Sequence, residues 1–186
     1  MNSIYGEHLP EMNAIADEIS RMLENGNYEH IRRRIKSEES MRNKCRLNHL
    51  PENERSALES IHDAIGFRII CHFIDEVYDY AEMIRNAFTV TAEKDYIRNC
   101  KPNGYRSYHM IVRYKGYYVE FQLRTIAMDT WASLEHEIKY KKELSNPELI
   151  GAELKRCADE LASCDISMQV LRKKIQSERQ ETPKTL

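Results

Sequence analysis

The chain has 186 residues, of which 41% are hydrophobic and 31% charged, and its 28 basic residues nearly balance its 30 acidic residues. This composition excludes a disordered acidic tail, a collagen-like chain and a uniformly basic nucleic-acid coat, and the length fits one domain with added helices. The apolar runs are too short to cross a bilayer and the acidic N-terminus is not a signal peptide, so we expect a cytoplasmic protein with no membrane partner.

The first predicted element is a helix over about residues 7–24. In chain order we then expect a strand at 29–36, a helix at 38–47, a loop or short helix at 51–61, a strand at 65–73, a helix at 76–87, strands at 88–95, 105–114 and 117–124, and helices near 126–142 and 148–178. The last helix carries an apolar stripe typical of core or partner-helix packing. This order predicts an α+β protein with about five strands and a long C-terminal helix.

Charge is unevenly distributed along the chain. Residues 1–29 hold six acids and one base, whereas residues 30–46 hold seven bases and two acids. Most of these bases are typical of a solvated face, but Arg34, Lys36 and Lys44 lie around a strand-to-helix junction with Ser37 as the expected N-cap. A helix N-terminus with cations beside it can bind phosphate.

The strands at 105–114 and 117–124 form a predicted hairpin, because Lys115-Gly116 fits a two-residue turn. The resulting register pairs Tyr114 with Tyr117, Val112 with Val119, Ile111 with Glu120, His109 with Gln122 and Ser107 with Arg124. Apolar side chains then share one face, and the other face carries Tyr105, Ser107, His109, Glu120, Gln122 and Arg124. Such a face could be solvated, but its mixture of chemical groups favours a binding site.

Two further segments add charged groups to this region. Residues 101–104 form a turn that carries the cation Lys101 and suits an anionic ligand. Asp63 lies at the entrance of an apolar strand and Arg68 inside it, where a charge is costly unless it is paired or liganded. Asp63 and Glu120 could hold Mg²⁺ together if their strands are neighbours; the alternative is an ion pair between Asp63 and Arg68.

Five motifs in order strongly resemble the synthetase domain of the RelA/SpoT family, in particular its single-domain small alarmone synthetases of the RelQ/RelP type. They are RIKS at 34–37, DAIGFR at 63–68, KPNGYRSYH at 101–109, EFQLRT at 120–125 and WASLEH at 131–136. The resemblance implies a mixed sheet flanked by helices, similar to nucleotidyltransferases. It also implies transfer of the β,γ-pyrophosphate of ATP to the 3'-hydroxyl of GDP or GTP, which releases AMP and makes the alarmones ppGpp and pppGpp of the stringent response.

The resemblance further implies roles for individual residues. Asp63 and Glu120 are the expected Mg²⁺ ligands and catalytic carboxylates, with Glu120 as the base for the 3'-hydroxyl. The expected ATP contacts are Arg34, Lys36, Lys44 and Arg68. The expected GDP or GTP contacts are Lys101, Tyr105, His109, Gln122, Asp129 and Glu135. Tyr105 would stack on guanine and Asp129 would face the guanine edge, whereas Glu135 either supports the site or pairs with Lys139.

The expected domain organisation is an N-terminal helix over 1–27, a synthetase domain over 28–142 and a C-terminal helical segment over 143–186 that contacts other copies. Resembling proteins form tetramers, so we expect a homo-oligomer. No hydrolase motif precedes the synthetase motifs, so we expect synthesis without hydrolysis.

Two alternatives stay open at this stage. The first is a toxin-type relative that acts on adenine nucleotides or on the tRNA 3' end. The second is a non-catalytic regulator that binds RNA or nucleotides, favoured by the basic run from Arg32 to Arg46. Single-stranded RNA is also a candidate partner of a synthetase.

Overall fold

The computed structural model describes residues 3–140 and 146–181 and contains one five-stranded sheet. In spatial order its strands are β1 (His30–Ile35), β2 (Ile65–Cys71), β5 (Tyr117–Thr125), β4 (Tyr108–Tyr114) and β3 (Thr89–Asp95). β2 and β5 run parallel, and the other neighbouring strands run antiparallel. The predicted α+β class, with a mixed sheet of five strands, is confirmed.

The helices of the described segments follow the predicted order. They are α1 (Leu9–Leu23), α2 (Glu38–Leu47), α3 (Ile74–Ala87), α4 (Ile126–Tyr140) and α5 (Pro147–Glu181), and a single π-helical turn occupies Ser56–Ser60. No helix among the described residues is long and apolar enough to span a membrane. The predicted boundary between the synthetase domain and the C-terminal segment, at 142–143, lies outside the described residues.

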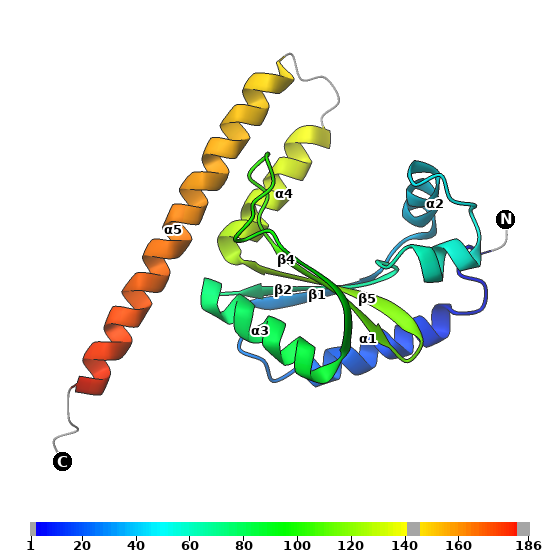
Figure 1. The fold of residues 1–186 in the computed structure, drawn as a ribbon, viewed down its shortest axis with the longest axis horizontal. Helices are drawn as coiled ribbons and strands as arrows, with labels where there is room; N and C mark the ends of the chain where they lie inside the picture. The colour runs from blue at the N-terminus through cyan, green and yellow to red at the C-terminus, as the bar shows by residue number, and fades with distance from the viewer. Residues whose placement is uncertain (1–2, 141–145, 182–186) are drawn as a thin grey trace.

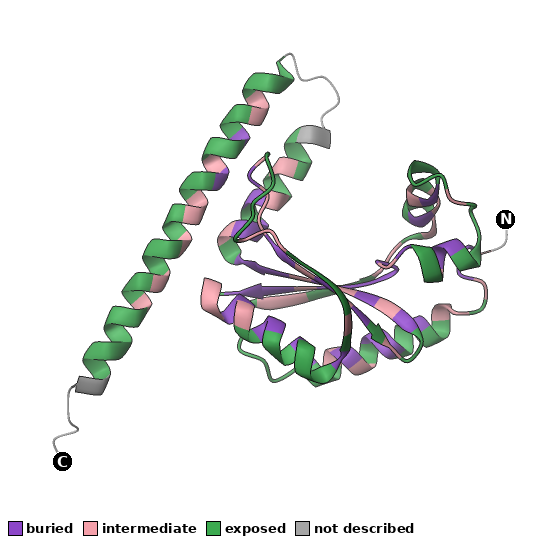
Figure 2. Ribbon diagram, in the orientation of Figure 1, coloured by how far each residue is buried: buried purple, intermediate pink, exposed green. Residues whose placement is uncertain are grey.

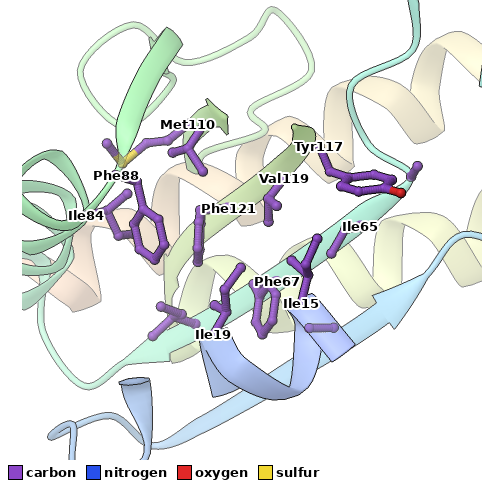
Figure 3. Close-up of a cluster of buried hydrophobic side chains, with 14 of the residues drawn as sticks. Ile15, Ile19, Ile65, Phe67, Ile84, Phe88, Met110, Tyr117, Val119 and Phe121 are labelled. Atoms are coloured by element: carbon purple, nitrogen blue, oxygen red, sulfur yellow. The ribbon is translucent and has the colours of Figure 1, made fainter. Parts of the chain in front are cut away.

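α1 and α3 cover one face of the sheet (Figure 1). The core lies between them and the strands: Ile19 of α1 and Ile84 of α3 are fully buried, and Phe67 and Phe121 stack with ring centroids 5.4 Å apart (Figure 3). Strand side chains alternate between the two faces, so the apolar residues of β2, β4 and β5 supply this core and their polar neighbours point to the opposite face. α2 and α4 rise at the two ends of that opposite face (Figure 1).

The hairpin register is confirmed from the Tyr108–Leu123 pair to the Tyr114–Tyr117 pair, whereas the predicted pair of Ser107 with Arg124 lies outside the paired strands. Lys115 and Gly116 have φ angles of 47° and 87°, as a type I' turn requires, and His109 pairs with Gln122. Because the side-chain period is two, this turn fixes which residues of both strands face the core.

Two strand boundaries differ from the prediction. The strand predicted at 65–73 ends at Cys71, because the Glu76 carboxylate accepts hydrogen bonds from the backbone N–H groups of His72 and Phe73 and so caps a helix that begins at Ile74, not at 76. The strand predicted at 105–114 begins only at Tyr108. Residues 101–105 form a turn instead, in which the N–H of Lys101 donates to the carbonyl of Tyr105.

α5 is 35 residues long and mostly exposed (Figure 2). Its first half packs on α4, where Trp131, Leu154 and Ala158 form a small core separate from the main one. Its second half is attached to α3, since Arg172 forms ion pairs with Asp75 and Glu76.

Asp165 of α5 gives a testable link between pH and stability. Its carboxylate accepts a hydrogen bond of 2.5 Å from Thr125, which also caps α4 by accepting from the N–H of Met128. Burial raises the pKa of Asp165 above its usual value of 3.8 in spite of the Thr125 bond. A raised folded-state pKa means that stability is full below the unfolded-state pKa and is lost as the pH rises through the folded-state pKa.

We therefore expect Asp165→Asn to raise the free energy of unfolding at pH 8 by roughly 1 kcal/mol, or about 2–4 °C in Tm. The gain should vanish at pH 3, where the wild-type carboxyl is protonated. Urea unfolding at both pH values measures this, and an equal effect at the two pH values would contradict it.

Candidate active site

Asp63 lies just before β2, at the α2 end of the open face of the sheet. It is 8% exposed, and its Oδ2 accepts hydrogen bonds from Lys36 Nζ at 2.8 Å and Lys44 Nζ at 2.6 Å. Burial alone would raise the pKa of Asp63, but the two lysines hold it below its ordinary value. The alternative of an ion pair with Arg68 is wrong, because Arg68 donates to Asp129 instead.

The local sequence explains why the two lysines reach Asp63. The N–H of Lys36 donates to the carbonyl of Ala64, which continues the pairing of β1 and β2 past the end of the strands. Ser37 then caps α2, accepting a hydrogen bond of 3.3 Å from the N–H of Ser40, as the sequence predicts. α2 therefore starts beside Asp63 and carries Lys44 to it.

Glu120 lies in the middle of β5, beside Gly66 of β2. Its Oε1 is 3.3 Å from His109 Nδ1, and its Oε2 accepts a hydrogen bond of 3.0 Å from Gln122. Burial raises the pKa of Glu120 and the charge of Asp63 adds to this, but the contacts with His109 and Gln122 hold it below its ordinary value. Glu120 is therefore ionised at neutral pH.

The donor atoms of Asp63 and Glu120 fit a hard divalent cation. Asp63 Oδ1 is buried and has no hydrogen-bond partner, and the pKa of Glu120 responds to the charge of Asp63. The described part of the chain has no group of three or more His, Cys, Asp or Glu side chains that could hold a metal ion. Two carboxylates completed by phosphate oxygens and water are a common Mg²⁺ environment.

Basic residues surround Glu120 on the open face. A pocket of about 250 Å³ is lined by Arg32, Arg33, Arg34, Gly66, Phe67, Arg68, Glu120 and Gln122. The side chain of Arg34 lies over Gly66, where a Cβ would be 3.7 Å from it. Burial and then the charge of Arg124 lower the pKa of Arg68, and its buried Nε has no partner. An anion in this pocket would stabilise these guanidinium groups.

Tyr105 is the centre of a second cluster, at the α4 end of the same face. Its hydroxyl lies 2.8 Å from His109 Nε2 and accepts a hydrogen bond of 2.7 Å from Arg124. Lys101 Nζ lies 4.9 Å from the centroid of the Tyr105 ring and 4.7 Å from that of Tyr96. Lys101, Tyr105 and His109 are thus brought together as the sequence predicts.

A second pocket, of about 490 Å³, joins the two clusters. Its lining residues are Arg34, Arg68, Tyr105, Arg124, Ala132, Ser133, Glu135 and His136. Arg34 and Arg68 line both pockets, so the pockets meet at these two side chains. Glu135 accepts a hydrogen bond of 3.3 Å from Asn103; its predicted alternative partner, Lys139, has a side chain outside the described residues.

Asp129 has partners that the sequence did not predict. Its Oδ1 accepts hydrogen bonds from Arg124 at 2.9 Å and from Arg68 at 3.2 Å, and the residue is 7% exposed. The Asp129 carboxylate thus links Arg68, which lines both pockets, to Arg124, which contacts Tyr105.

Arg124 is placed on the polar face by the sequence but is given no individual role there, and the structure makes it the most connected residue of this cluster. It is 4% exposed and donates hydrogen bonds to four different residues: Tyr105, Ser107, Gln122 and Asp129. The hairpin register placed it on the polar face, which was the available signal. The family resemblance gave it no role.

A pocket that contains the Glu120 carboxylate and meets a second pocket at two arginines is typical of an enzyme that transfers a phosphoryl-type group. Residues 33–145 match the model of a region found in RelA/SpoT proteins. The GTP pyrophosphokinase YwaC of Bacillus subtilis is 38% identical over 157 residues, which cover 79% of this chain and 75% of that protein. The chain belongs to the RelA/SpoT family.

Solved structures agree with this assignment. Small alarmone synthetase 1 from Bacillus subtilis superposes with a TM-score of 0.81 at 31% identity, covering 91% of this chain and 96% of that one. The same synthetase bound to its product pppGpp gives a TM-score of 0.75 at 32% identity, covering 93% and 95%. The match therefore extends beyond the motifs to both flanking helices, α1 and α5.

Proposed function

We propose that the protein is a GTP pyrophosphokinase that transfers the β,γ-pyrophosphate of ATP to the 3'-hydroxyl of GDP or GTP. The observation that carries this proposal is the junction of the two pockets at Arg34 and Arg68, with the ionised Glu120 beside it. Such a site can hold two nucleotides at once, which a direct transfer requires.

In this reaction the 3'-oxygen of the acceptor forms a bond with the β-phosphorus of ATP. The bond between that phosphorus and the oxygen bridging to the α-phosphate breaks, and AMP leaves with the bridging oxygen. Glu120 accepts the proton of the 3'-hydroxyl, for which its low pKa keeps it ionised. His109, 3.3 Å from Glu120, orients this carboxylate.

The cations of the site neutralise the donor's phosphates. Arg34 and Arg68 contact ATP, and Lys36 and Lys44 bind its triphosphate, near the Asp63 carboxylate that they now contact. Asp63 and Glu120 would hold Mg²⁺, which when bound supplies positive charge to the transferring group.

The acceptor is bound by the Tyr105 cluster. The Tyr105 ring stacks on guanine, and Lys101 binds the acceptor's 5'-phosphates. His109 and Gln122, which contact Glu120, lie beside the acceptor. Glu135 lines the pocket beside Tyr105, and Asp129 acts through the two arginines that it holds.

The test is separation of nucleotide products by anion-exchange chromatography after incubation with ATP, Mg²⁺ and one acceptor. We expect AMP release together with ppGpp from GDP or pppGpp from GTP, no product from ADP or tRNA, no hydrolysis of the product and loss of the reaction in excess EDTA. Product formed only with ADP or tRNA would identify a toxin-type activity instead. Binding without turnover would favour the regulator.

We also propose that the protein forms a homotetramer in the cytoplasm. α5 leaves a group of apolar side chains 42–57% exposed, namely Ile166, Met168, Val170, Leu171 and Ile175. Light scattering coupled to size exclusion tests the tetramer, and a monomer would contradict it. Single-stranded RNA is a further proposed partner, for which the exposed Arg32, Arg33 and Arg34 of β1 supply charge.

A further inference from the structure

The turn that carries Lys101 and Tyr105 rests directly on α5. Gly104, at the tip of the turn, has a φ of 90°, and a Cβ placed on it would lie only 2.5 Å from the Cβ of Ala158. A side chain at position 104 is therefore excluded both by the backbone conformation and by the helix. The turn therefore packs directly on α5, whose Lys155 Cα would lie 3.4 Å from the same Cβ.

Arg106 connects the turn to the helix by three hydrogen bonds. Its Nη1 donates to the carbonyl of Gly104 at 3.0 Å and to the carbonyl of Ala158 at 3.3 Å. Its Nη2 donates to Asp159 Oδ1 at 3.0 Å. The planar guanidinium can bridge these acceptors because its donors have a fixed geometry, which a lysine does not provide.

Tyr105 also packs against a cluster that contains residues of α5. Trp131 of α4 donates a hydrogen bond of 2.7 Å from its Nε1 to the carbonyl of Leu154 in α5. The Trp131 ring contacts the edge of the Tyr105 ring, with centroids 6.4 Å apart. The Tyr105 side chain thus packs against the small core of Trp131, Leu154 and Ala158.

Backbone hydrogen bonds within the turn connect Lys101 to Tyr105 and Gly104. The N–H of Lys101 donates to the carbonyl of Tyr105 at 3.2 Å, and the N–H of Gly104 donates to the carbonyl of Lys101 at 2.8 Å. These two backbone hydrogen bonds fix the position of Lys101 relative to Tyr105. In contrast, Arg34, Lys36 and Lys44 belong to β1, α2 and the junction between them, and α2 lies at the far end of the open face (Figure 1).

We propose that α5 is part of the acceptor site, and that Arg106 is a positioning residue which holds the Lys101–Tyr105 turn for the guanine nucleotide. Arg106 itself lines neither of the two pockets of the site. This inference rests on the proposed function, because it assigns α5 to the acceptor and not to ATP.

The first test is a comparison of KM values. For Arg106→Ala we expect the KM for GDP to rise about tenfold, since three hydrogen bonds that fix the turn are lost, while the KM for ATP stays within about twofold. Asp159→Ala, a substitution at an exposed position that removes one of the three bonds and keeps the other two, should give the same selective effect at about two- to threefold. Arg156→Ala is the matched control, because Arg156 pairs only with Glu153 and Glu160 on the outer surface of α5.

The second test does not depend on turnover. Trp131 is the single tryptophan of the chain and contacts Tyr105, so GDP binding to the enzyme without ATP should change its fluorescence. The GDP affinity measured in this way should fall about tenfold in Arg106→Ala and stay unchanged in Arg156→Ala. A wild-type protein that binds GDP but makes no product would overturn the proposed function and leave this measurement valid.

Three results would overturn the positioning role. One is an Arg106→Ala protein that binds GDP as tightly as the wild type. Another is an equal rise of KM for ATP and GDP in that variant. The third is an Asp159→Ala protein in which neither KM changes.

Discussion

Replacing Glu120 by Gln is expected to lower kcat for pyrophosphate transfer by about a thousandfold or more. Gln keeps the shape and the neighbours of the side chain, but it can neither accept the proton of the 3'-hydroxyl nor offer a charged oxygen to Mg²⁺. Loss of a general base typically accounts for about 10²–10⁴ in rate. Because the same carboxylate is also a proposed metal ligand, we expect the upper part of that range.

The measurement is the rate of AMP release at saturating ATP and GDP, together with the Tm of each variant. The Tm should stay near the wild-type value, since the amide fits between His109 and Gln122. Glu59→Gln is the control, because Glu59 is exposed and pairs only with Arg55 along its own segment. A kcat within tenfold of the wild type would show that Glu120 is not the base.

The hairpin shows what the sequence could predict about the site. One turn, Lys115-Gly116, fixed the register, and the two-residue period of the strands then placed His109, Glu120 and Gln122 on one face. The turn geometry and the two-residue period of a strand both depend on neighbouring residues alone, so they suffice to predict this face. The sequence alone therefore predicts which face of the hairpin carries the polar side chains of the site.

The neighbouring turn shows why other features could not be predicted. Tyr105, Ser107 and Tyr108 have the side chains of a strand, yet only Tyr108 belongs to β4. Gly104 and Arg106 contact α5 some 50 residues later in the chain, and this long-range packing decides the conformation of the turn. A propensity that reflects neighbouring residues contains no information about such a contact.

The ion pairs of the site show the same limit. Asp63 and Arg68 are close in sequence and were plausible partners, but each pairs with residues of a different part of the chain. Asp63 meets Lys36 and Lys44 from the β1–α2 junction, and Arg68 meets Asp129 from the start of α4. The partners of a charged side chain depend on how separate helices and strands are arranged in space. The spacing of residues along the chain does not determine this arrangement.

Removing the carboxylate of Asp129 is expected to destabilise the fold by about 3–5 kcal/mol. Asp129→Ala would leave Arg68 and Arg124 close together without their shared anion, and Arg124 has only 5% of its side chain exposed. A buried charge that loses its partner costs far more than an exposed one. For a chain of this length, this corresponds to a fall in Tm of roughly 6–20 °C.

Urea unfolding of the wild type, Asp129→Ala and Asp129→Asn measures this effect, with Asp79→Ala as a control at an exposed carboxylate of α3. Asn keeps the size of the side chain but not its charge, so it should still lose most of the stabilisation. ATP at saturating concentration should restore part of the lost stability, because its phosphates bring negative charge to Arg68.

Unchanged stability together with a changed preference for the acceptor would instead support the role in guanine recognition that the family resemblance implies for Asp129. In that case the variants would unfold at the wild-type urea concentration, and only their KM for GDP or their choice between GDP and ADP would change. The two roles are distinguishable because Oδ1 accepts from both arginines, so a structural role must show itself in the protein without nucleotide.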